Sequence, residues 1–220
     1  MKDEERVLLD EWSAQRPEYK IFVRDGILNK SLYTASNPKI AILLKESNDD
    51  FVEIAPLTTD GYGPNGNSSH FWRNINIYTY IATCAWNNIN PIYDDIHEIT
   101  EKQVNSIAYI NVKKNAENKS VSNDNEILEY SERDQPFLRK QLRIIQPQIV
   151  FCGNTKKCYD FIADSSFLKH NVYLGKNRLV IDYYHPSYAF GFEKHVEILS
   201  TCLFDSDVQR AIQEVKSAGY

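Results

Sequence analysis

Short apolar runs alternate with amphipathic stretches along the chain, and this alternation predicts an α/β fold. Four runs are predicted to be strands, because each is mostly apolar and ends at polar residues: 39–44, 107–110, 147–153 and 178–182. Nearly continuous apolar runs are typical of strands that are buried on both faces, as in a parallel sheet. We therefore expect a central four-stranded, mostly parallel sheet flanked by helices.

Apolar positions at helical spacing predict the helices around this sheet. Six helices are expected: 3–14, 68 or 69 to about 86, 95–104, 126–145, a stretch from about 155, and 194–217. The 95–104 helix is expected to be short, and the 126–145 helix is expected to kink near Pro136. Residues 56–70 are rich in Gly, Pro, Asn and Ser and are predicted to be a loop. The chain has neither repeats nor a compositional break, so we expect one domain over 1–220, with a core at 38–190 between an N-terminal helical extension and a C-terminal helix.

Composition narrows the classes of protein that fit. Of the 220 residues, 42% are hydrophobic, and the formal net charge is −5. An acidic chain is not expected to coat nucleic acid nonspecifically, although a local basic patch can suffice. The four cysteines have no CxxC spacing, so we expect no metal site, and the absence of a leader or a long apolar run predicts a cytoplasmic protein without a membrane span.

Polar residues follow several of the predicted strands directly. Glu46, Asn111, Asn154 and His185 all have this position, and open α/β sheets bind ligands beyond the carboxyl ends of their strands. The stretch 61–66 fits GxGxxG literally. It lies about a dozen residues after the strand and contains Pro64, so we interpret it as a loop over a site rather than a dinucleotide fingerprint.

Four segments together resemble the uracil-DNA glycosylase superfamily over about residues 38–190. Residues 110–114 (INVKK) resemble a TNVVK-like strand end, and 184–188 (YHPSY) resemble a YHPS motif. Between them, 135–142 and 147–153 resemble the helix and strand of the same branch, in the same order. The resemblance implies a uracil-DNA glycosylase-like fold that acts on DNA.

The chain departs from that branch at two places. Its first motif, 44–49 (LKESND), contains neither Gly nor Pro. Asn115 and Asp134 stand where the branch has two of its iron–sulfur cysteines, and the N-terminal cysteine pair is absent. We therefore expect no cluster and no cofactor.

The resemblance also implies roles in breaking an N-glycosidic bond, for which the base must first leave the stack. Asn111 would read the flipped base, and His185 would donate to a base oxygen as negative charge develops there. Glu46, with Asp49 as an alternative catalytic carboxylate, would favour the sugar cation or hold the attacking water.

Further residues are expected at the base and on the DNA. Phe71 or Trp72 could stack on the base, although amphipathic-helix core is an alternative for both. Ser187, Tyr188, Lys113 and Lys114 are predicted to contact DNA, although lysines in such a run can also form a solvated face.

The resulting hypothesis is a monomeric, monofunctional DNA glycosylase that leaves an abasic site. The target base is open: a modified pyrimidine, such as glucosylated hydroxymethylcytosine of phage DNA excised in anti-phage defence, or uracil or another deaminated base excised in repair. The main alternative is a non-catalytic nucleic-acid-binding or sensing module on the same fold. An enzyme that acts on free nucleosides or nucleotides is the third possibility.

Overall fold

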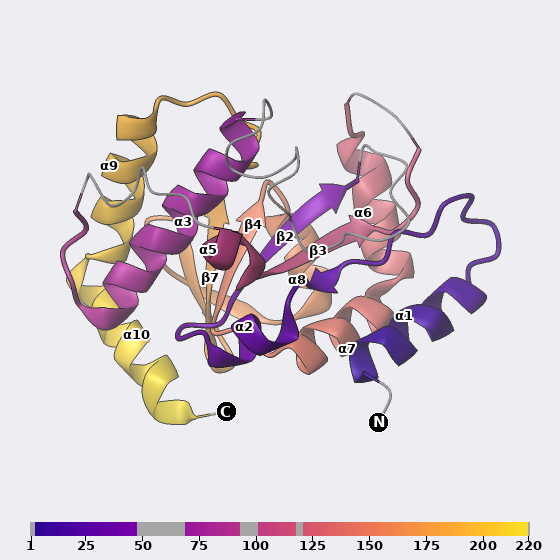
Figure 1. The fold of residues 1–220 in the computed structure, drawn as a ribbon, viewed down its shortest axis with the longest axis horizontal. Coiled ribbons are helices and arrows are strands. Elements are labelled where there is room, and N and C mark those ends of the chain that lie inside the picture. Colours follow the sequence, from indigo (N-terminus) through magenta and orange to yellow (C-terminus); the bar gives the residue numbers. More distant parts are fainter. Residues whose placement is uncertain (1–2, 48–68, 93–100, 118–120, 220) are drawn as a thin grey trace.

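A mixed sheet forms the centre of the molecule (Figure 1). The structure is a computed structural model that describes residues 3–47, 69–92, 101–117 and 121–219. In these ranges the sheet has seven strands in the order β1–β3–β2–β4–β7–β6–β5. The strands are β1 (Gly26–Ile27), β2 (Ile40–Glu46), β3 (Ala108–Lys113), β4 (Ile149–Gly153), β5 (Ser165–Lys169), β6 (Val172–Gly175) and β7 (Arg178–Tyr183).

The middle of the sheet is parallel, and its edges are antiparallel. β2 pairs in parallel with both β3 and β4, and β4 pairs in parallel with β7. β1 adds to β3 antiparallel, and the β5–β6 hairpin adds to β7 antiparallel. Consequently β3, β2, β4 and β7 all end at one edge of the sheet, which we call the carboxyl edge.

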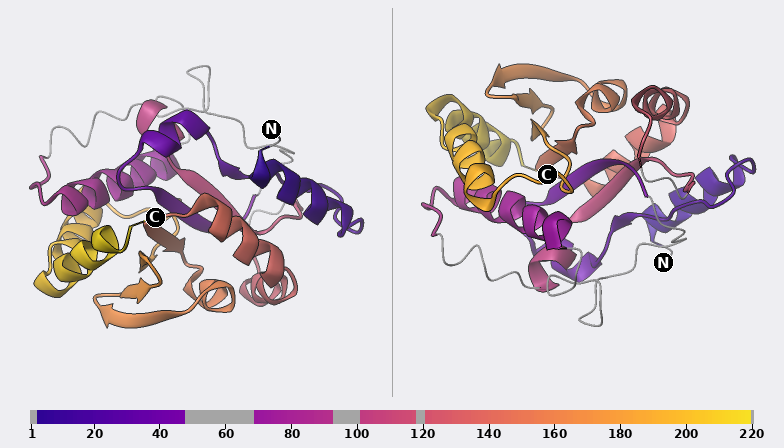
Figure 2. Two further views of the ribbon diagram at one scale, coloured as in Figure 1. Left: turned by 90° about the horizontal axis from the view of Figure 1, so that it is seen from below. Right: turned by 90° about the horizontal axis from the view of Figure 1, so that it is seen from above.

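Helices cover both faces of the sheet. They are α1 (Glu4–Ala14), α2 (Lys30–Ala35), α3 (Ser69–Asn87), α5 (Glu101–Asn105), α6 (Asp124–Arg133), α7 (Gln135–Ile145), α8 (Lys156–Ile162), α9 (Phe192–Leu203) and α10 (Ser206–Ala218). Buried residues of α3, α9 and α10 form one core cluster with the sheet, and those of α1, α6, α7 and α8 form a second cluster on the other face. Figure 2 shows from below and from above that the orange β5–β6 hairpin is set apart from the indigo N-terminal helix α1.

The general α/β class is confirmed, but the expected four-stranded sheet is wrong, because seven strands are present in the described ranges. The four expected apolar runs are its parallel middle. The strands that were missed are β1, which has only two residues, and the β5–β6 hairpin, whose β5 is buried nowhere along its length. Neither carries the apolar signal on which the sequence prediction relied.

Two expected helices are each divided in two. The 126–145 stretch breaks at Asp134, because Pro136 lies in the first turn of α7, has no backbone N–H and cannot continue α6. The C-terminal stretch breaks at Phe204, and the Asp205 carboxylate then caps α10 by accepting from the backbone N–H of Asp207 at 2.9 Å. The predicted 56–70 loop and 95–104 helix lie mostly outside the described residues.

Candidate functional site at the carboxyl edge

One face of the parallel strands brings several predicted site residues to the carboxyl edge. The residues that precede them on this face, Leu44, Tyr109, Phe151 and Tyr183, all belong to the core cluster under α3. Strand alternation places Glu46, Asn111 and Gly153 two positions further along on the same face, and His185 follows the end of β7 by two residues. Leu44 is the register partner of Asn111, and Gly153 is the partner of Tyr183.

The segment after β7, residues 184–190, is held by helix α3. The side-chain amide of Asn74 donates to the carbonyl oxygens of Pro186 at 2.7 Å and Tyr188 at 3.0 Å. The Tyr78 hydroxyl donates to the carbonyl of Tyr184 at 3.3 Å. These bonds fix the backbone on both sides of His185, and sequence reasoning had not assigned Asn74 or Tyr78 a role. The available signal was the position of Asn74, at helical spacing from Phe71 and Tyr78 on the apolar face of the predicted helix.

Gly153 lets this segment pass close over the end of β4. A Cβ atom at this position would lie 3.4 Å from Pro186 Cδ and 3.5 Å from His185 Cα. It would also lie 3.3 Å from a methyl group of Leu44, which is tighter than most real contacts. The 184–190 segment therefore lies directly over the end of β4, and a side chain at Gly153 would press mainly on Leu44.

His185 is a neutral imidazole whose proton is on Nε2. Its Nδ1 accepts a hydrogen bond from the backbone N–H of Ser187 at 3.2 Å, so Nδ1 carries no proton. Burial, with a smaller contribution from Lys45, lowers the pKa of His185 to about 4. At neutral pH the ring therefore keeps one N–H, on Nε2, which can donate to a ligand.

Aromatic rings connect His185 to the strand that carries Asn111. The rings of His185 and Phe71 lie 6.1 Å apart, and Phe71 packs edge-on against Trp72 at 4.8 Å. Trp72 in turn packs against Tyr109 at 5.9 Å. Phe71 is thus brought to His185. Trp72 packs on Tyr109 and is partly buried against the core cluster.

Asn111 is 2% exposed, and its backbone N–H donates to Asp25 Oδ2 at 2.7 Å. Its side-chain amide offers both donors and an acceptor, so it is suited to a polar ligand at this edge.

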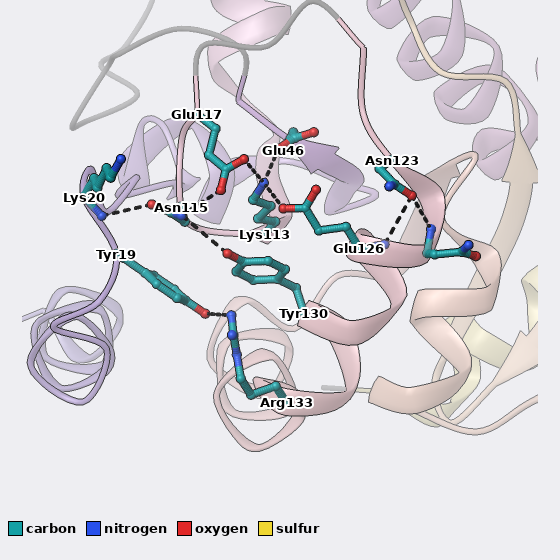
Figure 3. Close-up of polar contacts among 11 residues, drawn as sticks. Tyr19, Lys20, Glu46, Lys113, Asn115, Glu117, Asn123, Glu126, Tyr130 and Arg133 are labelled. Carbon is teal, nitrogen blue, oxygen red and sulfur yellow. Dashed lines mark hydrogen bonds and ion pairs between the residues drawn. The ribbon is translucent and has the colours of Figure 1, made fainter.

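Glu46 belongs to a group of acidic residues around Lys113, which we call the Lys113 cluster (Figure 3). Lys113 Nζ lies 2.9 Å from a carboxylate oxygen of Glu46, 3.1 Å from one of Glu117 and 2.7 Å from one of Glu126. Burial alone would lower the pKa of Lys113, but the three carboxylates raise it above its ordinary value. Lys113 is thus a permanent cation that holds Glu46 in place.

The predicted DNA contacts of Lys113 and Lys114 are not supported by this arrangement. Both residues are 0% exposed. Lys114 Nζ lies 2.5 Å from Asp25 Oδ1 and 5.1 Å from the centre of the Trp12 ring. Buried ammonium groups that already have carboxylate partners cannot also reach a phosphate on the surface, so we assign both lysines structural roles.

Ser187 and Tyr188 are exposed beside His185. Tyr188 is 49% exposed and stacks on Tyr184 with the ring centres 5.0 Å apart. The exposed Ser187 hydroxyl lies next to the amide that orients His185. Asp49, the alternative catalytic carboxylate, lies outside the described residues.

No group of three or more metal-ligating side chains occurs in the part of the chain that the structure describes. The four cysteines are free. No described helix has both the length and the apolar character needed to cross a membrane.

The sequence matches no known family model and no curated protein. A functional argument for this chain therefore rests on the carboxyl edge itself.

Proposed function

We propose that the chain is a monofunctional DNA glycosylase of the uracil-DNA glycosylase type, which hydrolyses the bond between deoxyribose and a flipped base. The observation that carries the proposal is the neutral His185, whose Nδ1 is occupied by the Ser187 amide and whose Nε2–H is left to donate. A preorganised donor at a position where negative charge develops can contribute roughly 3–4 kcal/mol to lowering a barrier.

The spacing of the strands supports a base between Asn111 and His185. β3 and β7 are separated in the sheet by β2 and β4. Three strand spacings place their backbones about 14 Å apart. Over that distance, two side chains can contact opposite edges of one planar ring. Asn111 would read one edge of the base, His185 would contact an oxygen on the other, and the Phe71 ring would stack on its face.

In the proposed reaction, the C1′–N bond breaks, and its electron pair leaves with the base. The base anion accepts a hydrogen bond from His185 Nε2–H and afterwards takes a proton from solvent. Water adds to C1′ and releases one of its two protons, which leaves a hydroxyl group on C1′. The products are the free base and an abasic site. The Glu46 carboxylate, held by Lys113, would stabilise the positive charge on the sugar and orient the water.

The proposal is tested by base release from single- and double-stranded DNA that contains uracil, hypoxanthine, hydroxymethylcytosine or its glucosylated form. Alkali would reveal abasic sites as strand breaks. We expect breaks on one substrate, and a loss of at least 100-fold in rate for His185→Asn. The matched control is His170→Asn, an exposed histidine at positive φ, where Asn is tolerated. The control should retain the wild-type rate.

One observation favours a second function, a non-catalytic module that binds or senses nucleic acid. The Glu46 side chain is 3% exposed and already paired with Lys113, as expected for a structural carboxylate. This function predicts that the folded protein binds DNA but releases no base from any of the four substrates. That result would contradict the glycosylase proposal.

A further inference from the structure

A second potential ligand site lies at the opposite edge of the sheet from His185. An open cavity of about 650 Å³ is lined by residues of α7, α8, β5, β6 and β7 and of the segments that join them. Arg178, which begins β7, and Ile162, which ends α8, both line it. Because β7 runs toward the carboxyl edge, its first residue lies at the amino edge. The cavity is therefore separate from the site proposed for DNA.

The cavity is basic, although the protein is acidic. Four cations line it, against a single carboxylate, that of Asp164: Arg139, Arg143, Lys176 and Arg178. The whole chain has a formal net charge of −5. Cations gathered in a concave site raise the local concentration of anions, and guanidinium groups match the geometry of phosphate oxygens.

Several donors in the cavity lack acceptors. Arg178 Nε donates to the carbonyl of Lys176 at 3.3 Å. Its Nη1 is buried and has no hydrogen-bond partner among the described residues, and the same is true of Ser165 Oγ. A buried charged donor without an acceptor is unfavourable, so an anion placed here would satisfy it.

The other two arginines are oriented by backbone contacts. Arg139 Nε donates to the carbonyl of Phe161 at 3.2 Å, and Arg143 Nε donates to the carbonyl of Arg139 at 3.3 Å. Each bond uses only the Nε–H. Within the described ranges, the terminal Nη groups of both arginines have no hydrogen-bond partner and can bind an oxyanion.

The lining also has an apolar part, formed by Leu142, Ile162 and Leu174. A volume of about 650 Å³ exceeds what an inorganic anion needs and falls in the range of small-molecule sites. We propose that this cavity binds a small phosphate ester of nucleotide size, with its phosphate at Arg178, Arg143 and Ser165 and its organic part against the apolar side chains. This inference does not depend on the glycosylase proposal.

The test is isothermal titration calorimetry of the full chain at low ionic strength with inorganic phosphate, pyrophosphate, adenosine 5′-monophosphate and a 20-base-pair DNA duplex. We expect adenosine 5′-monophosphate to bind at least tenfold more tightly than inorganic phosphate, because only the ester uses the apolar lining. Arg143→Ala and Arg178→Lys should each weaken its binding by tenfold or more. The matched control is Lys157→Ala on α8, an exposed cation outside the cavity, which should leave binding unchanged.

Three outcomes would overturn the inference. One is that none of the phosphate probes binds at millimolar concentration. Another is that Arg143→Ala and Arg178→Lys bind as well as wild type while their thermal unfolding shows that they are folded. The third is that the DNA duplex binds, loses affinity in both variants and displaces adenosine 5′-monophosphate, which would make this face a DNA contact.

Discussion

Lys113 and Lys114 are consecutive residues at the end of β3, both are 0% exposed, and their surroundings differ. Lys113 has three carboxylate partners, and its pKa is raised. Among the described residues Lys114 has one ion-pair partner, Asp25, and burial lowers its pKa although Asp25 opposes the change. Lys114 lies deeper in the protein than Lys113, so the depth of burial and the number of carboxylates around each ammonium together separate the two pKa values.

The Lys114 cluster, which consists of Lys114, Asp25, Glu5 and Gln141, is the more fully buried of the two. Gln141 Nε2 donates to Asp25 Oδ1 at 3.0 Å and to Glu5 Oε1 at 3.2 Å. Burial raises the pKa of Glu5 to about 7, despite hydrogen bonds from Ile27 and Gln141 that lower it. Lys114 thus pairs with Asp25, and Gln141 joins Asp25 to Glu5 in a buried site, whereas the outer carboxylates of the Lys113 cluster are about a quarter exposed.

The largest expected effect is that of removing Lys114. Lys114→Met should lower the free energy of unfolding at pH 7 by about 3–5 kcal/mol, because it leaves the Asp25 carboxylate buried and unpaired. Urea denaturation measures this change. As a control, Lys140→Ala removes a lysine whose pair with Glu11 is about half exposed, and it should cost less than about 1 kcal/mol. A loss below about 1 kcal/mol in Lys114→Met would show that the buried pair is not needed.

Glu5 should give the stability of the protein a distinct pH dependence. The unfolded chain loses the Glu5 proton near 4.5, whereas the folded chain keeps it until about 7. Over this window the folded state binds more protons, so the contribution of Glu5 to the free energy of unfolding falls as pH rises, by about 3 kcal/mol in total.

Glu5→Gln should remove that fall. The measurement is urea denaturation of the variant and the wild type at pH 5, 6, 7 and 8, in which the difference between the two should shift in favour of the variant as pH rises. The new glutamine places an NH₂ group against the N–H donors of Ile27 and Gln141, and this lowers stability by the same amount at every pH. Comparing the slopes of stability against pH removes this constant cost. Parallel curves for the two proteins would contradict the raised pKa.

A smaller effect is expected at Lys113. Lys113→Met should cost about 2 kcal/mol at pH 7, because the partly exposed Glu117 and Glu126 can regain water and only Glu46 stays buried. Urea denaturation at pH 7 measures this change. If Glu46 handles water, base release should also fall in Lys113→Met and not in Glu117→Gln.

The sequence predicted the parallel middle of the sheet well, because buried strands are apolar along their whole length. It also placed Asn111 and His185 at or after the ends of strands that share the carboxyl edge, since parallel strands end at a common edge. It did not predict the burial of Lys113 and Lys114. Their partners Glu46 and Asp25 are distant in sequence, and a lysine that will be paired inside the protein looks the same in sequence as one on the surface.

The cavity at the amino edge was not predicted for a similar reason. Its cations come from α7 and from the β6–β7 turn, and part of its wall is formed by the β5–β6 hairpin that the apolar pattern missed. Arg139 Nε and Arg143 Nε are held by the backbone carbonyls of Phe161 and Arg139, respectively. Such contacts leave no trace in the spacing of residue types.

The two outer strands of the sheet have a consequence for self-association. β1 consists of only two residues, and Glu5 of α1 accepts the backbone N–H of Ile27 on it at 3.2 Å. At the other border, β5 shifts register between Phe167 and Lys169. The shift interrupts the regular row of backbone N–H and C=O groups along this strand. A short, capped border and an irregular one are poor templates for an incoming strand, so the sheet is protected at both ends against growing into a neighbouring copy.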